Sequence, residues 1–205
     1  MALFRVMQSN EYEILTLLTT VSDAFHRVSM HGTREELLDR QAASIGLPIE
    51  KVRIPYPCPN EIYEAKMNSV MMKYKARGLT HAIFGDLFLE DIRKYREEKL
   101  AKVQITPIFP LWNRDTTKLA NSILQAGFRA IISCVDPKKL DGKFAGRLFD
   151  ETFLQELPST VDPCGENGEF HTFVFDGPIF KKPIEVTTGQ SVVRDGFQFA
   201  DILPK

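Results

Sequence analysis

The segment Asp162–Pro178, which reads DPCGENGEFHTFVFDGP, gathers more groups able to do chemistry than any other stretch of this 205-residue chain. Glu166 and Glu169 are carboxylates that can bind a cationic group, and His171 is an imidazole that can exchange protons near neutral pH. Three glycines punctuate the segment, and glycine is selected where the backbone needs a positive φ or where a ligand approaches the main chain. The segment therefore indicates a loop that can hold a binding or catalytic site.

The loop runs directly into an apolar strand, Phe170–Phe175, which gives it a rigid support. Sites are often built on loops held in this way. The alternative is a tight glycine-rich turn whose acids face solvent, with His171 as a strand histidine that hydrogen-bonds locally. A nucleophilic role for Cys164 is not expected, because no basic partner stands near it in the sequence.

Composition excludes several functional classes. The formal net charge of −1 implies no general attraction to nucleic acid or to an anionic membrane. The three cysteines, Cys58, Cys134 and Cys164, lie far apart without a CxxC pair, which argues for a reducing compartment. No apolar run approaches the roughly 20 residues needed to span a bilayer, and the N-terminus lacks a signal-peptide layout. We therefore expect a cytoplasmic protein with no membrane contact and no direct nucleic-acid partner.

Helices and strands alternate over residues 1–113. The expected elements are a helix at Met1–Ser9, a strand at Glu13–Val21 that is buried on both faces, helices at Thr33–Ile45 and Glu61–Arg77, a strand at Thr80–Phe84, a charged helix at Leu89–Lys102 and a strand-like segment at Ile105–Trp112. Such alternation is typical of an α/β domain with a parallel sheet. Ligands bind beyond the carboxyl ends of such strands, which draws attention to Thr19–Asp23 and Gly85–Asp86. Asp86 can also cap the helix that follows it.

Two of these helices carry more detailed expectations. Thr33 and Glu36 have the spacing of a capping box, and Leu38, Ala42 and Ile45 form the expected buried stripe of the same helix. In the next helix the methionines Met67, Met71 and Met72 are interpreted as core filling, with a flexible binding surface as the alternative.

The second part of the chain, residues 114–205, is richer in strands. The expected elements are a helix at Asp115–Ala126 with Asp115 as N-cap, a strand at Phe128–Val135, a loop at Lys138–Gly146, a helix at Asp150–Leu157, a strand at Ile184–Thr188 and a hairpin that turns at Asp195–Gly196. We interpret this part as a smaller α+β domain, with the boundary near Asn113–Asp115.

Four segments, in this order, carry a resemblance to a known family: FGDLFLEDIRKYREE, PLWNRD, AGFRAII and DPCGENGEFHTFVFDGPIF. Together they resemble the diphthine–ammonia ligase family of PP-loop ATP pyrophosphatases, from Leu3 to about Ile184. The most specific part is the run from Cys164 to Thr172, which reads CGENGEFHT where the family carries a Cys-Gly-Glu-Gly-Gly-Glu-Tyr-Glu-Thr-like run.

The resemblance implies an adenine-nucleotide α-hydrolase-like domain, a Rossmann-like fold of the HUP type, with ATP at the carboxyl edge of the parallel sheet. It also implies a reaction in which a carboxylate is adenylated, pyrophosphate is released, and ammonia displaces AMP to give an amide. ATP and Mg²⁺ are the implied cofactors. Ammonia or ammonium and a carboxylate acceptor are the implied substrates. In the best-defined members the acceptor is diphthine on translation elongation factor 2.

Roles follow for individual residues under this resemblance. Glu166 and Glu169 bind the amine-bearing substrate or ammonium, with His171 as an auxiliary acid or base. Thr19, Gly85 and Asp86 line the adenosine side. The substrate-binding candidates are Arg93, Glu97, Trp112, Arg114, Cys164, Gly165, Asn167, Gly168 and Thr172. No protein metal ligands are predicted.

Two departures from the family pattern open alternatives. The phosphate loop Ser-Gly-Gly-Lys-Asp-Ser does not occur, and Met1–Ser9 resembles the helix that follows that loop, so we expect the chain to begin after it. A gene read from an internal methionine, a shortened version of the protein or a degenerate copy would each explain this. Phe170 and His171 also replace a Tyr-Glu pair, which leaves the acceptor open. The alternatives are another PP-loop reaction, such as amidation or thiolation of a different acceptor, or an inactive binding module.

Overall fold

Two short groups of parallel strands form the N-terminal half of the computed structural model, which describes residues 1–205. Strand β1 (Leu17–Ser22) pairs in parallel with β3 (Ile49–Ile54), and the two-residue strand β2 (Arg27–Val28) pairs antiparallel with the end of β1. Strands β4 (His81–Ile83) and β5 (Thr106–Ile108) form a separate parallel pair. The helices of this half are α1 (Ala2–Ser9), α2 (Glu35–Ile45), α3 (Asn60–Lys75) and α4 (Glu90–Ala101).

The C-terminal half is built on one antiparallel sheet in the order β7-β6-β9-β8. Its strands are β6 (Arg129–Val135), β7 (Phe170–Asp176), β8 (Val186–Arg194) and β9 (Phe197–Pro204). Helices α5 (Thr116–Gln125) and α6 (Glu151–Glu156) and a 3₁₀ turn, η1 (Gly142–Phe144), contribute to the core cluster on one face of this sheet. The fully buried ring of Phe153 lies at the centre of that cluster.

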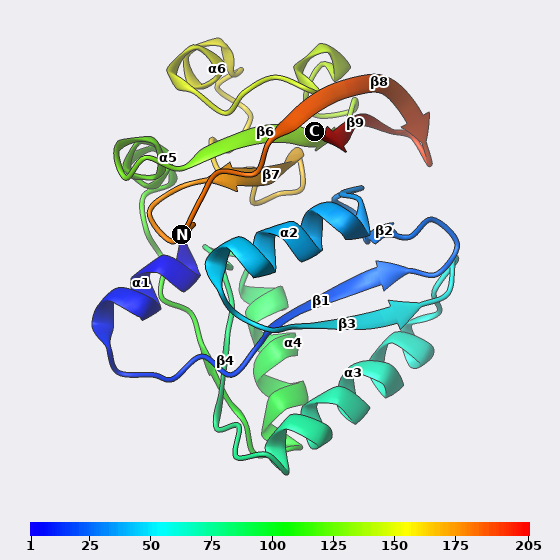
Figure 1. Cartoon of the computed structure of the whole chain (residues 1–205), viewed down its shortest axis with the longest axis vertical. Helices are drawn as coiled ribbons and strands as arrows, with labels where there is room; N and C mark the ends of the chain where they lie inside the picture. Colours follow the sequence, from blue (N-terminus) through cyan, green and yellow to red (C-terminus); the bar gives the residue numbers. More distant parts are fainter.

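Helix α2 covers the other face of the antiparallel sheet, so that one helix lies between the two sheets (Figure 1). Leu37 has no exposed surface and packs with Ile131 and Phe173 of the C-terminal half. Gln41 Nε2 also donates a hydrogen bond of 2.6 Å to the Val174 carbonyl. Because α2 has neighbours on two sides, its buried surface is wider than the predicted stripe: Leu37 belongs to it, whereas Ile45 is only half-buried.

The fold class is confirmed, as an α/β arrangement with a parallel sheet followed by an α+β part. Asp115 caps α5 as predicted, accepting a hydrogen bond of 2.8 Å from the Lys118 backbone N–H. The hairpin turns at Asp195–Gly196 with φ of 52° and 81°, the left-handed pair that a two-residue turn requires. The division into residues 1–113 and 114–205 stays a prediction. None of the helices has the length and apolar character of a membrane span.

Three expectations in the first half were wrong. No side chain caps α2, because Thr33 is buried and its carbonyl instead accepts a hydrogen bond from Val28 N in the turn before the helix. The strand Ile49–Ile54 was not foreseen. Strand β1 is shorter than predicted and is buried only at Val21 and Ser22, since its first residues face an open pocket.

Candidate functional site

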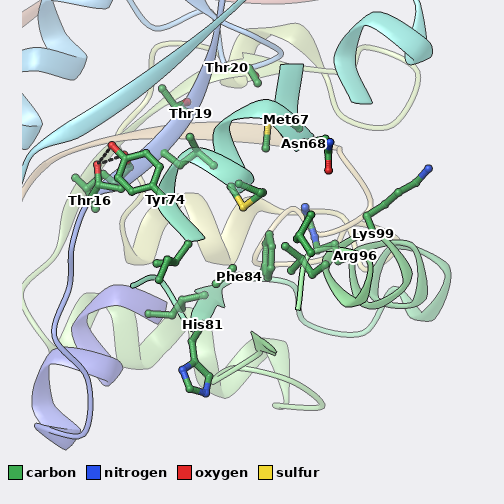
Figure 2. Close-up of a pocket in the computed structure, with 18 of the residues that line it drawn as sticks. Thr16, Thr19, Thr20, Met67, Asn68, Tyr74, His81, Phe84, Arg96 and Lys99 are labelled. Atoms are coloured by element: carbon green, nitrogen blue, oxygen red, sulfur yellow. Dashed lines mark hydrogen bonds between the residues drawn. The ribbon is translucent and has the colours of Figure 1, made fainter. Parts of the chain in front are cut away.

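A pocket of about 670 Å³ lies between β1 and β4 (Figure 2). Strand β1 pairs with β2 only at Val21 and Ser22, so its segment Leu17–Thr20 has no partner strand on that edge. Strand β4 pairs only with β5. Consecutive residues of both strands line the pocket, which happens when a strand presents its edge rather than one face. The pocket therefore separates two unpaired strand edges.

The pocket walls are mainly apolar, and α3 and α4 complete them. The lining side chains of α3 are Tyr63, Glu64, Met67, Asn68, Met71 and Tyr74, and those of α4 are Tyr95, Arg96, Lys99 and Leu100. Met67 lines the pocket, and Met71 both lines it and packs against the core cluster of Leu100, Val103 and Ile105, as predicted for core filling, whereas Met72 is 52% exposed. Thr19, predicted on the nucleotide side, is a lining residue.

Arg96 connects this pocket to Asp86, the second residue predicted on the nucleotide side. Its guanidinium donates to Asp86 Oδ1 at 3.1 and 3.2 Å and lies 4.4 Å from the ring centroid of Phe84. The Asp86 side chain is only 11% exposed. Asp86 does not cap α4, whose N-cap is Leu89 without a side-chain bond. Gly85 is exposed, has an ordinary φ and faces open space.

The glycine loop of the C-terminal half is organised around Asp162. One of its carboxylate oxygens, Oδ2, accepts hydrogen bonds from Cys164 N at 3.1 Å and Glu166 N at 2.9 Å. Gly165 has φ of +71°, and a Cβ there would lie 2.7 Å from the Phe170 carbonyl oxygen. Only glycine fits this position without strain. Gly168 also has a positive φ, of +78°, but open space around it.

Glu166 attaches this loop to the end of the parallel strands. Its Oε1 accepts a hydrogen bond of 2.7 Å from Leu87 N, directly after Asp86. Burial raises the pKa of Glu166, and the negative charges of Asp86 and Asp162 act in the same direction. The loop predicted to bind the acceptor thus contacts the loop predicted to line the adenosine side.

Glu169 points into the interior and is 2% exposed. Its Oε1 accepts from Asp162 N and from Asn167 Nδ2, each at 3.0 Å, whereas its Oε2 is buried without any partner. The Asn167 carbonyl in turn accepts from Lys139 Nζ at 2.5 Å. Glu169 therefore fixes the conformation of the loop and still has one oxygen able to accept a hydrogen bond.

His171 and Thr172 lie on β7 and meet His31, from the turn between β2 and α2. The ring centroids of His31 and His171 are 4.5 Å apart. Burial, with a smaller effect of His31, lowers the pKa of His171 to about 4, so its imidazole is neutral at pH 7. Burial lowers the pKa of His31, and the nearby backbone of Thr172 acts in the opposite direction.

The remaining predicted residues lie elsewhere. Arg93 pairs with Glu97 at 2.7 Å and stacks 4.7 Å from the Trp112 ring centroid, and the three line a shallow groove on the outer side of α4. Arg114 is exposed. The Cys164 thiol donates to the Thr116 carbonyl at 3.3 Å, and burial raises its pKa to about 12, so it is not a thiolate at neutral pH.

The volume of the β1–β4 pocket lies within the usual range of small-molecule and cofactor sites, so it fits a ligand of the size of an adenine nucleoside. No three His, Cys, Asp or Glu residues are arranged to hold a metal ion, and Asp86 is paired with Arg96.

Two functional candidates were missed from the sequence, Arg96 and His31. Arg96 looked like one more charge on a solvated helix, and only its stacking on Phe84 distinguishes it. His31 lies between Met30 and Gly32, in the turn that follows the short strand β2. A histidine beside a glycine was the feature of the sequence that could have indicated a functional residue here.

Comparison with known proteins gives a consistent result. Residues 115–202 match the family described as Diphthamide synthase C-terminal domain. The diphthine–ammonia ligases of Rattus norvegicus and Homo sapiens are 35% and 33% identical to this chain, each over 56% of it and 45% of their own length. That of Mus musculus is 27% identical over 86% of this chain and 68% of its own length.

The chain thus spans about half the length of the rat and human relatives. The longer match to the mouse protein shows that the similarity also extends into the N-terminal half. These matches agree with the resemblance that the motifs indicate: the chain is similar to diphthine–ammonia ligases, and its residues 115–202 match the family described as Diphthamide synthase C-terminal domain.

Proposed function

We propose that this chain carries out an ATP-dependent amidation in the cytoplasm, with ammonia as the nitrogen source and diphthine on elongation factor 2 as the acceptor; the name of its relatives, diphthine–ammonia ligase, supports this proposal. In that reaction a carboxylate is activated as its adenylate with loss of pyrophosphate, and ammonia then displaces AMP. The β1–β4 pocket would hold the adenosine part, between Thr19 on one wall and Phe84 and Arg96 on the other.

The observation that carries this proposal is the hydrogen bond between Glu166 and Leu87 N. An amide ligase must bring the activated carboxylate and the incoming amine to one point. Here a carboxylate from the C-terminal half reaches the carboxyl end of β4, which is where an α/β sheet binds its ligand. The contact therefore joins the two halves of such a site.

Two carboxylates would contribute to binding the amine. Glu166 lies beside Asp86, and together they make this end of the strands negative, which favours an ammonium or amine over an anion. Glu169, which is 2% exposed, would act indirectly, by fixing the loop that carries Glu166 through the hydrogen bonds of its Oε1. Both effects orient the nucleophile without a covalent step.

Glu166→Gln tests the role of Glu166, because glutamine keeps an oxygen that accepts from Leu87 N but removes the charge. With diphthine-bearing elongation factor 2, ATP, MgCl₂ and ammonium chloride, we expect the variant to retain ATP–pyrophosphate exchange and to lose amide formation, measured by mass spectrometry. Glu151→Gln, on the exposed surface of α6, is the matched control. Wild-type amide formation in Glu166→Gln would contradict the proposal.

One observation favours a second candidate, the same chemistry on a different acceptor. His171 stands where the family carries a carboxylate, and its pKa of about 4 makes it neutral at pH 7. A neutral imidazole does not attract the cationic group that a carboxylate would. Pyrophosphate exchange with other carboxylates, but not with diphthine-bearing elongation factor 2, would support this candidate.

A further inference from the structure

The turn between β2 and α2 is held in an unusual shape. Met30 and Gly32 both have positive φ, of 64° and 68°, so the backbone reverses around His31. A Cβ on Gly32 would lie 2.5 Å from the ring of Phe199 on β9, so only glycine lets the turn approach this strand so closely.

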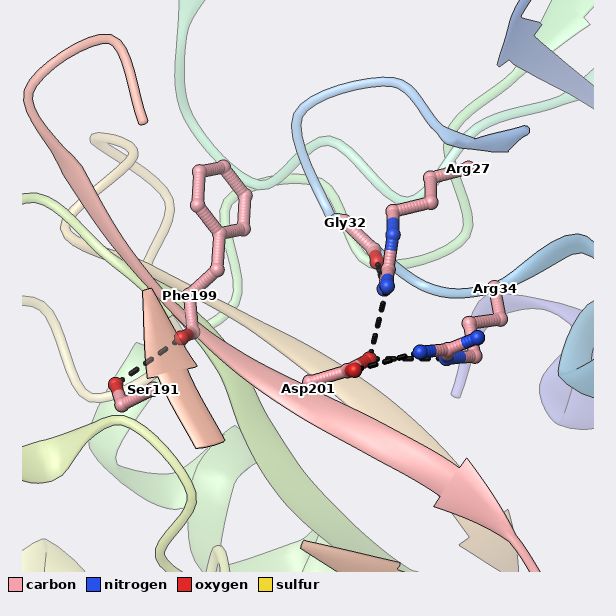
Figure 3. A network of polar contacts seen from close by, with 6 residues as sticks. All are labelled: Arg27, Gly32, Arg34, Ser191, Phe199 and Asp201. Carbon is pink, nitrogen blue, oxygen red and sulfur yellow. Dashed lines mark hydrogen bonds and ion pairs between the residues drawn. The ribbon is translucent and has the colours of Figure 1, made fainter. Parts of the chain in front are cut away.

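Ion pairs fix the same turn from its two flanks (Figure 3). Arg27 Nη2 and Arg34 Nη2 contact the two oxygens of Asp201 on β9 at 2.9 and 2.6 Å. Arg27 Nη1 also donates to the Gly32 carbonyl at 2.8 Å. The turn is therefore anchored to the antiparallel sheet, and its conformation does not depend on α2 alone.

The anchored turn directs His31 inward. Its side chain lines the β1–β4 pocket and at the same time contacts β7. Burial lowers the pKa of His31, which favours the neutral ring at pH 7. A neutral imidazole has one N–H and one nitrogen with a lone pair that can accept a proton. Ser29 Oγ, on the same turn and also lining the pocket, is buried with no partner.

These contacts point to a catalytic residue that the glycine motif does not contain. We propose that His31 is the proton acceptor of the amidation step, and this inference rests on the function proposed above. The ammonia nitrogen attacks the acyl carbon with its lone pair, the bond from that carbon to the phosphate oxygen breaks, and AMP leaves with the electron pair. The proton lost by nitrogen passes to the free ring nitrogen of His31.

The surroundings of His31 suit this task. The backbone of Thr172 raises the pKa of His31 and so favours the cation that forms, which partly offsets the effect of burial. The neighbouring ring of His171 stays neutral at pH 7 and does not repel the charge. A positioned base typically contributes about 10²–10⁴ in rate.

The test compares His31→Gln with His26→Gln, an exposed histidine near the same turn. With diphthine-bearing elongation factor 2 and ammonium chloride, we expect His31→Gln to lower amide formation about 10²–10⁴-fold while ATP–pyrophosphate exchange continues. His31→Ala should regain part of the rate when imidazole is added, which a purely structural role would not produce.

Each outcome decides the matter. Normal amide formation in His31→Gln, or no rescue of His31→Ala by imidazole, refutes the role of His31 and leaves the proposed function intact. Absence of pyrophosphate exchange in the wild type refutes the proposed function and the role of His31 with it. In ¹⁵N-histidine NMR spectra, two protonated ring nitrogens on His31 at pH 7 would also refute its role, whether or not the chain is active.

Discussion

The half-buried histidine of β7, His171, predicts a specific loss of stability in mild acid. His171 has an ordinary pKa of 6.5 and a folded-state pKa of about 4. Because the folded value is the lower one, the unfolded state takes up the proton first, and stability falls as pH decreases from about 6.5 to 4. Between pH 7 and pH 5 this linkage removes about 2 kcal/mol from the free energy of unfolding.

Urea unfolding of the wild type and His171→Gln at pH 7 and pH 5 measures this effect. Glutamine keeps a polar side chain of similar size but does not titrate. The wild type should lose about 2 kcal/mol more than the variant between the two pH values, or roughly 1 M in urea midpoint. Other groups titrate in both proteins and cancel in the comparison. Equal losses in the two proteins would refute the assignment of a neutral, half-buried His171.

Three further perturbations test the fold and the loop. Leu37→Ala should lower the free energy of unfolding by about 2–5 kcal/mol, because it empties a fully buried position against the antiparallel sheet, and a cost below about 1 kcal/mol in urea unfolding would contradict this packing. Gly165→Ala should destabilise the protein more than Gly168→Ala. Both glycines have positive φ, but only at position 165 would the new Cβ meet a backbone atom. Equal thermal unfolding midpoints for the two variants would contradict this prediction. Cys164 should resist iodoacetamide at pH 8 while Cys58 is alkylated, because burial raises the Cys164 pKa to about 12. Mass spectrometry of the native protein measures the alkylation of each cysteine, and faster alkylation of Cys164 than of Cys58 would contradict this prediction.

The helices and the C-terminal hairpin could be predicted because their signals are local. Asp115 caps the helix that it precedes, and Asp195–Gly196 supplies two left-handed residues for a turn. The strand Ile49–Ile54 was missed because its sequence, IEKVRI, mixes charges with apolar residues, and its pairing with β1 is a long-range contact. Leu37 was missed for a related reason, since a single helical stripe cannot reveal that a second sheet covers the helix.

The candidate site shows the same limit. The glycine motif identifies Glu166 from residue types alone, but its partner, Leu87 N, is a backbone group that no side-chain pattern marks. Thr33 has the right spacing for a helix cap, yet the turn around His31 uses its carbonyl instead. Tertiary contacts with β9 override the local preference, because the ion pairs of Asp201 and the close approach of Gly32 act on the same few residues.

The site depends on two reciprocal contacts between the halves. Glu166 extends from the C-terminal loop to Leu87 after β4, and His31 extends from the N-terminal turn to His171 on β7. Neither contact is strong by itself, since a hydrogen bond such as that of Glu166 contributes only about 0.5–1.5 kcal/mol net. Helix α2 lies between the two sheets with Leu37 packed on the antiparallel one, and this arrangement keeps the two halves close enough for both contacts (Figure 1). A change in the packing of α2 should therefore displace both sides of the pocket together, even though no residue of α2 contacts the proposed ligand.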